Sequence, residues 1–351
     1  MITIPEIPDI ANKIILDPAG GLGESLSVML KRGADPKNIY YNDDRNLMAR
    51  LFRTKNKKQN LGIPEENITD GNFLEWEPDL KFDVIIKNPP YEGLKALHQQ
   101  FFNKSVDMIK DGGSIVSIQP DSAYVSKKKN QKAPNAKMQD NIKKYKTEVK
   151  FVPGSIFKGA AIATGLAITH LTKIEDDQIS VEYINGDKYD HIDLEQINKL
   201  GVEPTLYKSL FSKFDSYISK NGNITNIVSF NNEGELCYGV SEIRGNPEND
   251  DFYGIVMRDS KKHNVGDHRF GFKILQGQEE SLYSYVTSFI ARFGLSLHKT
   301  TTNTNRSMAM IPLVPFDRIW TDEMLMREIG INDAEMAEIY NKLPDYYGLL
   351  K

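Results

Sequence analysis

Apolar runs and helical periodicities alternate along the first half of the chain. Short apolar runs predict strands at residues 13–16, 38–44, 67–74 and 82–86. Apolar residues at helical spacing predict helices at residues 24–31 and 47–52. The strand at 13–16, the glycine-rich turn after it and the following helix are the opening unit of a nucleotide-binding α/β fold. The pattern therefore predicts an α/β domain with a mostly parallel sheet.

The same alternation continues to about residue 175. An amphipathic helix is expected over residues 94–109, because apolar side chains recur there with a helical period. Further strands are expected at residues 114–118, 149–157 and 162–171. These elements complete a first domain, which is predicted to span residues 1–175.

Beyond residue 175 the composition changes to mixed charge with Tyr, Phe, Asn and Gly between short β-like runs. A stripe of apolar residues at helical spacing follows at 282–293, and two short helices are expected at 322–329 and 333–343. Residues 176–351 are therefore predicted to form a second domain of the α+β class.

The strand at 82–86 leads into Asn88-Pro89-Pro90-Tyr91. A planar amine is a poor nucleophile because its lone pair is delocalised into its ring. The Asn88 side-chain oxygen and the Pro89 carbonyl can accept hydrogen bonds from its two N–H groups and so orient it. Two prolines fix φ and lack N–H donors, so they hold these acceptors rigidly. Tyr91 offers a flat face on which an extruded base can stack. The alternative interpretation is a Pro-Pro strand terminator followed by a surface tyrosine.

Acidic and polar residues follow the three strands before this tetrapeptide. Asp17-Pro18-Ala19-Gly20-Gly21 follows the first strand, where glycines let the backbone approach a ligand and Asp17 is suited to a cationic ammonium group. Asp43 ends the second strand, near the spacing of a ribose-binding carboxylate. Asp70 and Asn72 follow the third and are suited to an adenine edge. Singly, each acid also fits a helix cap or a solvated loop; their order favours a ligand site.

This series of motifs resembles the S-adenosylmethionine-dependent adenine-N6 DNA methyltransferases of restriction-modification systems, in their gamma order with the cofactor motif first. The resemblance implies a Rossmann-like methyltransferase domain followed by a target-recognition, DNA-binding domain. Its implied cofactor is S-adenosyl-L-methionine, contacted by Asp17, Pro18, Ala19, Gly20, Gly21, Asp43, Asp70, Asn72 and Phe73. Its implied catalytic residues are Asn88, Pro89, Pro90 and Tyr91. Double-stranded DNA is the implied partner, with a cognate restriction endonuclease as a further candidate.

Two alternatives remain open. The same tetrapeptide occurs in methyltransferases that act on RNA or on protein glutamine, but those chains tend to lack a long domain behind the catalytic one. A catalytically silent DNA-binding relative is the other alternative. It is motivated by the sixteen residues before Asp17, fewer than the family usually has, and by Ala19 and Leu22, where the family commonly has Cys and Ser.

Composition narrows the class of protein. A single cysteine, Cys237, excludes an internal disulfide, and no run of about 20 apolar residues is present. A cytoplasmic protein without membrane contact is therefore expected. The six histidines show no ligand spacing with cysteines or carboxylates, so no metal site is predicted.

Charge is unevenly distributed. The net charge of −4 argues against a protein that binds nucleic acid with its whole surface. The stretch from residue 126 to residue 150, however, carries nine lysines and two acids. It is interpreted either as a mobile loop that contacts phosphates beside a duplex or as an ordinary solvated loop.

Overall fold

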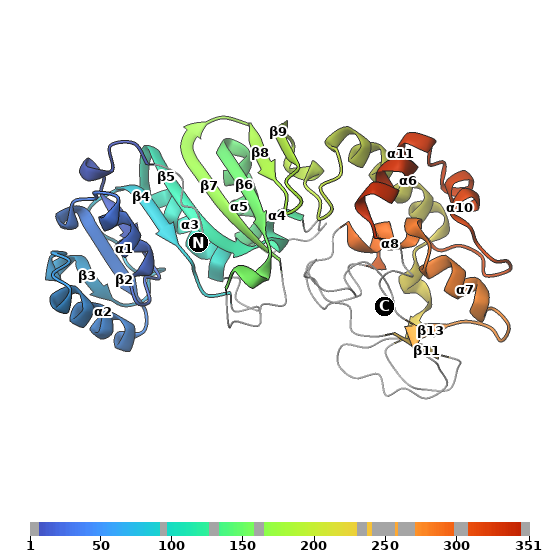
Figure 1. Cartoon of the computed structure of the whole chain (residues 1–351), viewed down its shortest axis with the longest axis horizontal. Helices are drawn as coiled ribbons and strands as arrows, with labels where there is room; N and C mark the ends of the chain where they lie inside the picture. Colours follow the sequence, from blue (N-terminus) through green and yellow to red (C-terminus); the bar gives the residue numbers. More distant parts are fainter. Residues whose placement is uncertain are drawn as a thin grey trace. The chain divides into compact units, whose positions relative to one another are not determined.

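The computed structural model describes eight segments of the chain: residues 7–91, 97–125, 133–157, 165–229, 237–240, 257–258, 271–297 and 308–344. The chain divides into two compact units. The first unit comprises Met1–Ala123, Lys128–Val152 and Leu166–Leu194, and the second unit comprises the rest. Figure 1 follows the chain from the first unit in blue and green to the second in yellow and red.

A nine-stranded sheet forms the framework of the first unit, with the strand order β3-β2-β1-β4-β5-β7-β6-β8-β9. The strands are β1 (Ile15–Asp17), β2 (Ile39–Asp43), β3 (Ile68–Asp70), β4 (Phe82–Lys87), β5 (Ile109–Pro120), β6 (Tyr145–Val152), β7 (Leu166–Glu175), β8 (Ile179–Glu182) and β9 (Lys188–Ile192). The first five strands pair in parallel, and β7 runs antiparallel to β5 and β6. The predicted α/β class with a mostly parallel sheet is confirmed.

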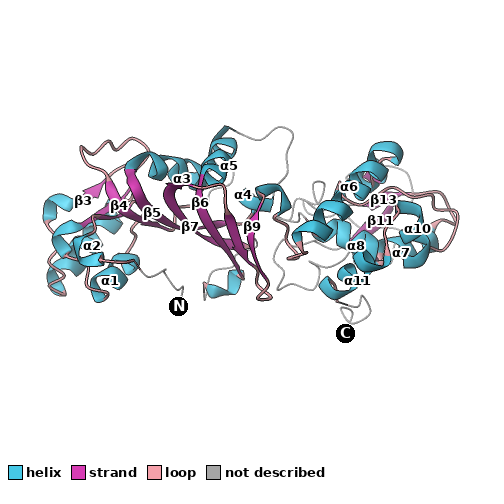
Figure 2. Ribbon diagram, turned by 90° about the horizontal axis from the view of Figure 1, so that it is seen from above, coloured by secondary structure: helices cyan, strands magenta, loops and turns pink. Residues whose placement is uncertain are grey.

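Helices cover both faces of this sheet. Figure 2 shows α1 (Glu24–Lys31) and α2 (Asn46–Lys58) on one side, and α3 (Leu97–Met108) and α5 (Ala133–Lys144) on the other. A single turn, α4 (Ser122–Val125), follows β5. The strands are nearly continuous apolar runs, such as Val84, Ile85 and Ile86, because a parallel sheet covered on both faces is buried on both.

The structure corrects the predicted loop at residues 126–150. Residues 133–144 form α5, whose apolar positions Met138 and Ile142 are fully buried, and residues 145–152 form β6. Three of the lysines make ion pairs within the first unit: Lys137 with Asp107, Lys144 with Glu175 and Lys150 with Glu182. Lys127, Lys128, Lys129 and Lys132 lie outside the described residues. The prediction of a lysine-rich loop is therefore wrong from residue 133 onward.

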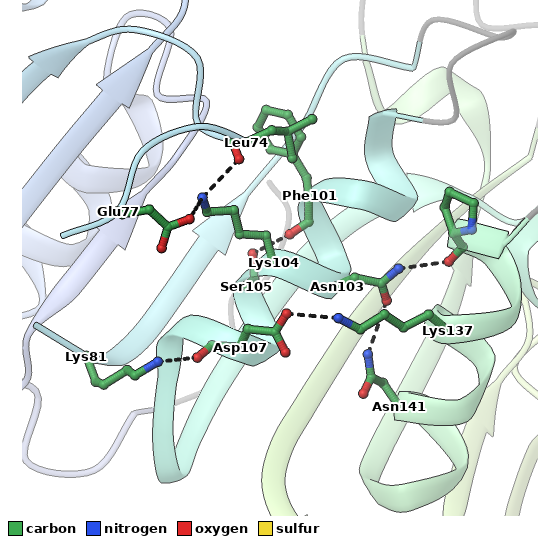
Figure 3. A network of polar contacts seen from close by, with 11 residues as sticks. Leu74, Glu77, Lys81, Phe101, Asn103, Lys104, Ser105, Asp107, Lys137 and Asn141 are labelled. Carbon is green, nitrogen blue, oxygen red and sulfur yellow. Dashed lines mark hydrogen bonds and ion pairs between the residues drawn. The ribbon is translucent and has the colours of Figure 1, made fainter. Parts of the chain in front are cut away.

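Helix α3 is held on two sides by polar contacts (Figure 3). On one side Lys104 Nζ donates to the Leu74 carbonyl at 3.0 Å and contacts Glu77 at 2.8 Å. On the other side Asn103 Nδ2 donates to the Pro134 carbonyl at 2.8 Å, next to the ion pair of Lys137 with Asp107 at 2.9 Å. These contacts fix α3, which follows the Asn-Pro-Pro-Tyr tetrapeptide in sequence, against both the loop after β3 and α5.

The boundary between the units lies later than predicted. The sequence predicts a first domain that ends at residue 175, but the first unit extends to Leu194. The reason is that β8 pairs with β6 and β9 pairs with β8, so residues 179–192 continue the same sheet. Short β-like runs after a change of composition are therefore no sign of a new domain here.

The second unit combines helices with a small sheet. Its helices are α6 (Pro204–Asn221), α7 (Glu279–Val286), α8 (Phe289–Ser296), α10 (Asp322–Ile329) and α11 (Asp333–Lys342). Its sheet has the order β10-β13-β11-β12, with β10 (Val228–Ser229), β11 (Cys237–Val240), β12 (Met257–Arg258) and β13 (Gly271–Lys273). The predicted stripe at 282–293 divides into α7 and α8, because the Ser288 side chain accepts from the Ala291 N–H and starts a new helix. Both helices contribute to one core with α6 and α11.

Glu335 links α11 to α6 in the core of the second unit. Its buried carboxylate accepts from Lys213 Nζ and Ser209 Oγ, each at 2.6 Å, and its side chain also accepts from the Asn332 N–H in a capping box. Burial raises the pKa of Glu335, but Lys213 and the hydrogen bonds lower it more, so that the net shift is downward.

We expect Glu335→Gln to reduce the free energy of unfolding by about 1–3 kcal/mol at pH 7, because it removes the charge that Lys213 meets. A lowered folded pKa stabilises the protein above the unfolded value and loses that contribution as pH falls through the folded pKa. The variant should therefore lose less stability than the wild type between pH 6 and pH 3. Urea unfolding at several pH values measures the free energy of unfolding and its pH dependence, with Glu280→Gln on the surface as control. If Glu335→Gln and Glu280→Gln reduced the free energy of unfolding equally, the role of the Lys213–Glu335 pair would be contradicted.

Candidate active site

The order of the strands brings the predicted motifs to one edge of the sheet. From β1 the chain moves outward to β2 and β3, then returns to β4 on the other side of β1. The register pairs Ile15 with Val84 and Leu16 with Ile85. Asp17 is the last residue of β1 and Asn88 the first after β4, so both lie at the carboxyl ends of adjacent parallel strands. Ligands of open α/β sheets bind at this reversal of strand order, so the edge is the candidate active site.

Asp17 begins the glycine turn and is buried, with 3% of its surface exposed. Its carboxylate accepts from the Ala19 N–H at 3.1 Å and from the Ser25 hydroxyl of α1. Burial raises the pKa of Asp17 to about 6, and nearby Asp43 adds to the rise, against the lowering effect of the two hydrogen bonds. No cation among the described residues pairs with this carboxylate. A buried carboxylate of this kind suits a cationic group of a ligand.

Asp43 ties the end of β2 to the same turn. Its Oδ2 accepts from the Gly21 N–H at 2.8 Å, and its Oδ1 accepts from the Arg45 N–H and Nε, each at 3.0 Å. The Gly20 N–H donates to the Asn42 carbonyl at 2.9 Å. Asp17, Gly20, Gly21 and Asp43 are thus brought together, as predicted from their order along the chain.

Two stacked aromatic side chains pack beneath the glycine turn, with the Tyr41 ring against Gly20. Tyr41 and Phe52 stack with ring centroids 4.2 Å apart and an interplanar angle of 7°, and the Tyr41 hydroxyl donates to the Gly21 carbonyl at 2.8 Å. A Cβ on Gly20 would lie 2.4 Å from the Tyr41 ring, whereas a Cβ on Gly21, whose φ is +52°, would meet nothing within 4 Å. The stack therefore requires glycine at position 20, and the open side of Gly21 leaves space for a ligand.

We expect Gly20→Ala to lower the free energy of unfolding by about 2–3 kcal/mol, because the added methyl group would clash with the Tyr41 ring, which is held by its stacking on Phe52. Gly21→Ala should cost only about 1 kcal/mol, the strain of a left-handed residue with a side chain. Urea unfolding of the two variants measures the difference. Equal costs would contradict the role assigned to the Tyr41 stack.

The residues predicted after β3 occupy different environments. Asp70 accepts from Asn46 Nδ2 at 2.5 Å, and exposed Asn72 accepts from the Leu74 N–H at 3.1 Å. Phe73 is 1% exposed and packs against Phe101 of α3 with ring centroids 4.9 Å apart. Asp70 and Asn72 therefore lie at the carboxyl end of β3 beyond Asp43, while the Phe73 side chain belongs to the core.

The Asn-Pro-Pro-Tyr tetrapeptide follows β4. Asn88 and Pro90 are exposed, Pro89 is buried, and Tyr91 is half-buried. The Tyr91 hydroxyl lies 2.5 Å from Asn88 Oδ1 and 3.2 Å from the Ile118 carbonyl oxygen of β5. Burial raises the pKa of Tyr91, so the phenol stays protonated and donates at neutral pH. Asn88 thus presents an amide oxygen at the edge of the sheet, supported by the tyrosine.

Two buried basic groups behind the tetrapeptide escaped the sequence analysis. Lys87, the last residue of β4, is 1% exposed, and its Nζ lies 4.9 Å from the centroid of the Phe102 ring. His98 of α3 is 8% exposed and meets the Tyr91 ring edge-on at 6.5 Å. Within the described ranges, neither side chain has a hydrogen-bond partner. Burial moves the pKa of Lys87 well below its usual value, and burial together with Lys87 lowers that of His98 to about 4.

We expect Lys87→Met to raise the free energy of unfolding by about 2–4 kcal/mol at pH 7.5, because it removes the cost of burying an amine without a partner. A lysine with a lowered folded pKa binds fewer protons in the native state, so the stability of the wild type should rise with pH up to about 10. The variant should lack that rise. Urea unfolding at pH 7.5 and 9.5 tests the stabilisation and its pH dependence, with exposed Lys110→Met as control. If Lys87→Met were less stable than the wild type, the Lys87 amine would have a stabilising partner in the folded protein.

Neither a metal site nor a membrane span is found where the structure describes the chain. No group of three or more His, Cys, Asp or Glu side chains there is arranged to hold an ion. None of the helices described there combines the length and the apolar character that a bilayer crossing requires.

Comparison with known proteins finds similarity over part of the chain. Residues 2–149 match the family model of the methyltransferase small domain. The type II methyltransferase M.VspI of Vibrio sp. (strain 343) is 32% identical over 108 residues, which are 30% of this chain and 26% of that protein. The alignment thus spans about a quarter of that relative.

Two solved structures share parts of the fold. The M protein of the type I restriction enzyme EcoKI is 14% identical, with 49% of this chain and 44% of that chain covered and a TM-score of 0.38. A protein described as a modification subunit of a type I restriction enzyme from Vibrio vulnificus YJ016 is 16% identical, with 64% and 54% covered and a TM-score of 0.39. Over residues 2–149 the chain is therefore similar to a methyltransferase domain, and over 108 residues it is similar to a type II methyltransferase.

Proposed function

We propose that this protein transfers a methyl group from S-adenosylmethionine to the N6 amine of adenine in double-stranded DNA. The observation that carries the proposal is the placement of Asn88 beside the glycine turn, at the carboxyl ends of the adjacent strands β4 and β1. One edge of the sheet thereby holds a cofactor turn and an exposed amide oxygen followed by two prolines. A cognate restriction endonuclease is the further partner that this function suggests.

The residues of the turn fit S-adenosylmethionine. Asp17 would pair with the ammonium group of its methionine part, since this buried carboxylate has no cationic partner among the described residues. The open side of Gly21 would face the ligand, because nothing lies within 4 Å of a Cβ built there, while its N–H and carbonyl stay bonded to Asp43 and Tyr41. Asp43 would hold the turn on the ribose side through Gly21 and Arg45, and Asp70 and Asn72 would lie toward the adenine edge. When bound, the cofactor supplies a methyl group activated by the sulfonium.

The chain's own residues would then orient the acceptor. Asn88 Oδ1 and the Pro89 carbonyl would accept hydrogen bonds from the two N–H groups of the adenine amine. These hydrogen bonds would turn the lone pair of the amine nitrogen toward the methyl group. After it has received the methyl group, the amine nitrogen would release one of its two protons to solvent. Tyr91 supports the extruded base. Positioning and preorganised acceptors, rather than a strong base, provide the rate enhancement.

Nucleoside mass spectrometry tests the proposal. The protein is expressed in a host without adenine methylases of its own, and its DNA is compared with that of cells expressing Asn88→Ala. N6-methyladenine only with the wild type is the expected result. Its absence, with soluble protein that binds S-adenosylmethionine, would redirect the assignment to RNA or protein glutamine. Absence of cofactor binding would favour a silent DNA-binding protein.

A further inference from the structure

The Tyr91 hydroxyl lies between two acceptors. It is 2.5 Å from Asn88 Oδ1 and 3.2 Å from the Ile118 carbonyl oxygen. A phenol has one hydrogen, so it donates to one of the two at a time, and the shorter distance favours Asn88. The oxygen of Asn88 is also the acceptor that the proposed function assigns to the target amine. The tyrosine hydroxyl and the amine therefore compete for one atom.

The surroundings hold the Tyr91 ring in place while leaving its hydrogen free to turn. His98 contacts the ring edge-on, with centroids 6.5 Å apart and an interplanar angle of 85°. Helix α3, which carries His98, is fixed by Lys104 and Asn103 on two sides (Figure 3). Rotation about the bond between ring and hydroxyl oxygen moves the hydrogen from one acceptor toward the other without displacing the ring.

We propose that the Tyr91 hydroxyl is a placeholder for the target amine: it occupies Asn88 until the amine displaces it, and the Ile118 carbonyl then receives its hydrogen. This inference rests on the proposed function of Asn88. It makes the hydroxyl a positioning group that is separate from the stacking face of the ring. A base without an amine leaves the hydroxyl on Asn88, so this acceptor stays satisfied until an amine displaces the hydroxyl.

The test compares Tyr91→Phe, which keeps the ring and removes the hydroxyl, with Tyr145→Phe in β6 as matched control. The substrates are genomic DNA free of N6-methyladenine and tritiated S-adenosylmethionine. Part of the wild-type protein is held in a form that cannot accept the amine, which raises its apparent KM. We expect Tyr91→Phe to lower the KM for DNA by about 2- to 10-fold, the worth of one neutral hydrogen bond, without a fall in kcat. Tyr145→Phe should match the wild type.

Each other outcome overturns a distinct part of the scheme. An unchanged KM in Tyr91→Phe would show that the amine uses the second lone pair of Asn88 and that nothing is displaced. A lower kcat would show that the hydroxyl takes part in the reaction itself. A wild type that methylates no adenine in this DNA would overturn the proposed function, and the placeholder with it; the first two outcomes require an active wild type, so the failures are distinguishable.

Discussion

Replacing Asn88 with alanine is expected to reduce methyl transfer by at least about 100-fold. Removal of one preorganised hydrogen-bonding group from a site of developing charge typically costs about 2.7–4 kcal/mol in the barrier. Asn88 is exposed and fills no core position, so among the described residues its truncation removes only the hydrogen bond from Tyr91. The midpoint of thermal unfolding should therefore move little. The affinity for S-adenosylmethionine should also hold, because Asp17 and the glycine turn are untouched.

Three measurements separate these expectations: tritium incorporation into DNA, thermal unfolding and calorimetric binding of S-adenosylmethionine. Asn185→Ala provides a matched control, since Asn185 is exposed in the turn between β8 and β9 and its side chain exchanges hydrogen bonds with Asp187. A variant that keeps its full turnover would remove Asn88 from the catalytic set. If Asn88→Ala lost both turnover and its fold, the Asn88 side chain would have a structural role instead.

The sequence was sufficient for the framework of the site because local patterns encode it. Apolar runs that end in Asp17, Asp43 and Asp70, together with Asn88 directly after the fourth strand, already fix which residues follow which strand. Parallel pairing then brings them to one edge. What no local pattern contains is the Tyr41 and Phe52 stack under the glycines, because its two rings come from different elements.

Elsewhere the pattern of charges conceals the helical period of the apolar residues. Met138 and Ile142 lie four residues apart, a spacing that indicates a helix, yet the lysines around them favoured a loop. Lys87 ends a strand just before the Asn-Pro-Pro-Tyr tetrapeptide, where a lysine is usually solvated. In the structure it is buried over Phe102. Burial of a charge depends on helices that cover the sheet, and that information lies elsewhere in the chain.

Asp17→Asn is expected to stabilise the protein without ligand and to weaken its cofactor binding. The rise of the Asp17 pKa from 3.8 to about 6 means that the ionised form is penalised in the native state. A raised folded pKa stabilises the fold below the unfolded value and loses that contribution as pH rises through about 6. At pH 8 the penalty is complete, so removing the charge should raise the free energy of unfolding by about 1–3 kcal/mol. At pH 4 the two proteins should unfold alike.

Cofactor binding should respond in the opposite direction. Loss of a charge-assisted pairing of about 1.5–3 kcal/mol corresponds to roughly 10- to 100-fold weaker binding of S-adenosylmethionine at pH 8. A cation beside Asp17 favours the ionised form, so binding to the wild type near pH 6 should release protons and weaken as the pH falls. Calorimetry in buffers of different ionisation enthalpy measures this release, which Asp17→Asn should lack. Equal affinity in both proteins across this pH range would show that Asp17 shapes the turn through Ser25 and Ala19 and touches no ligand.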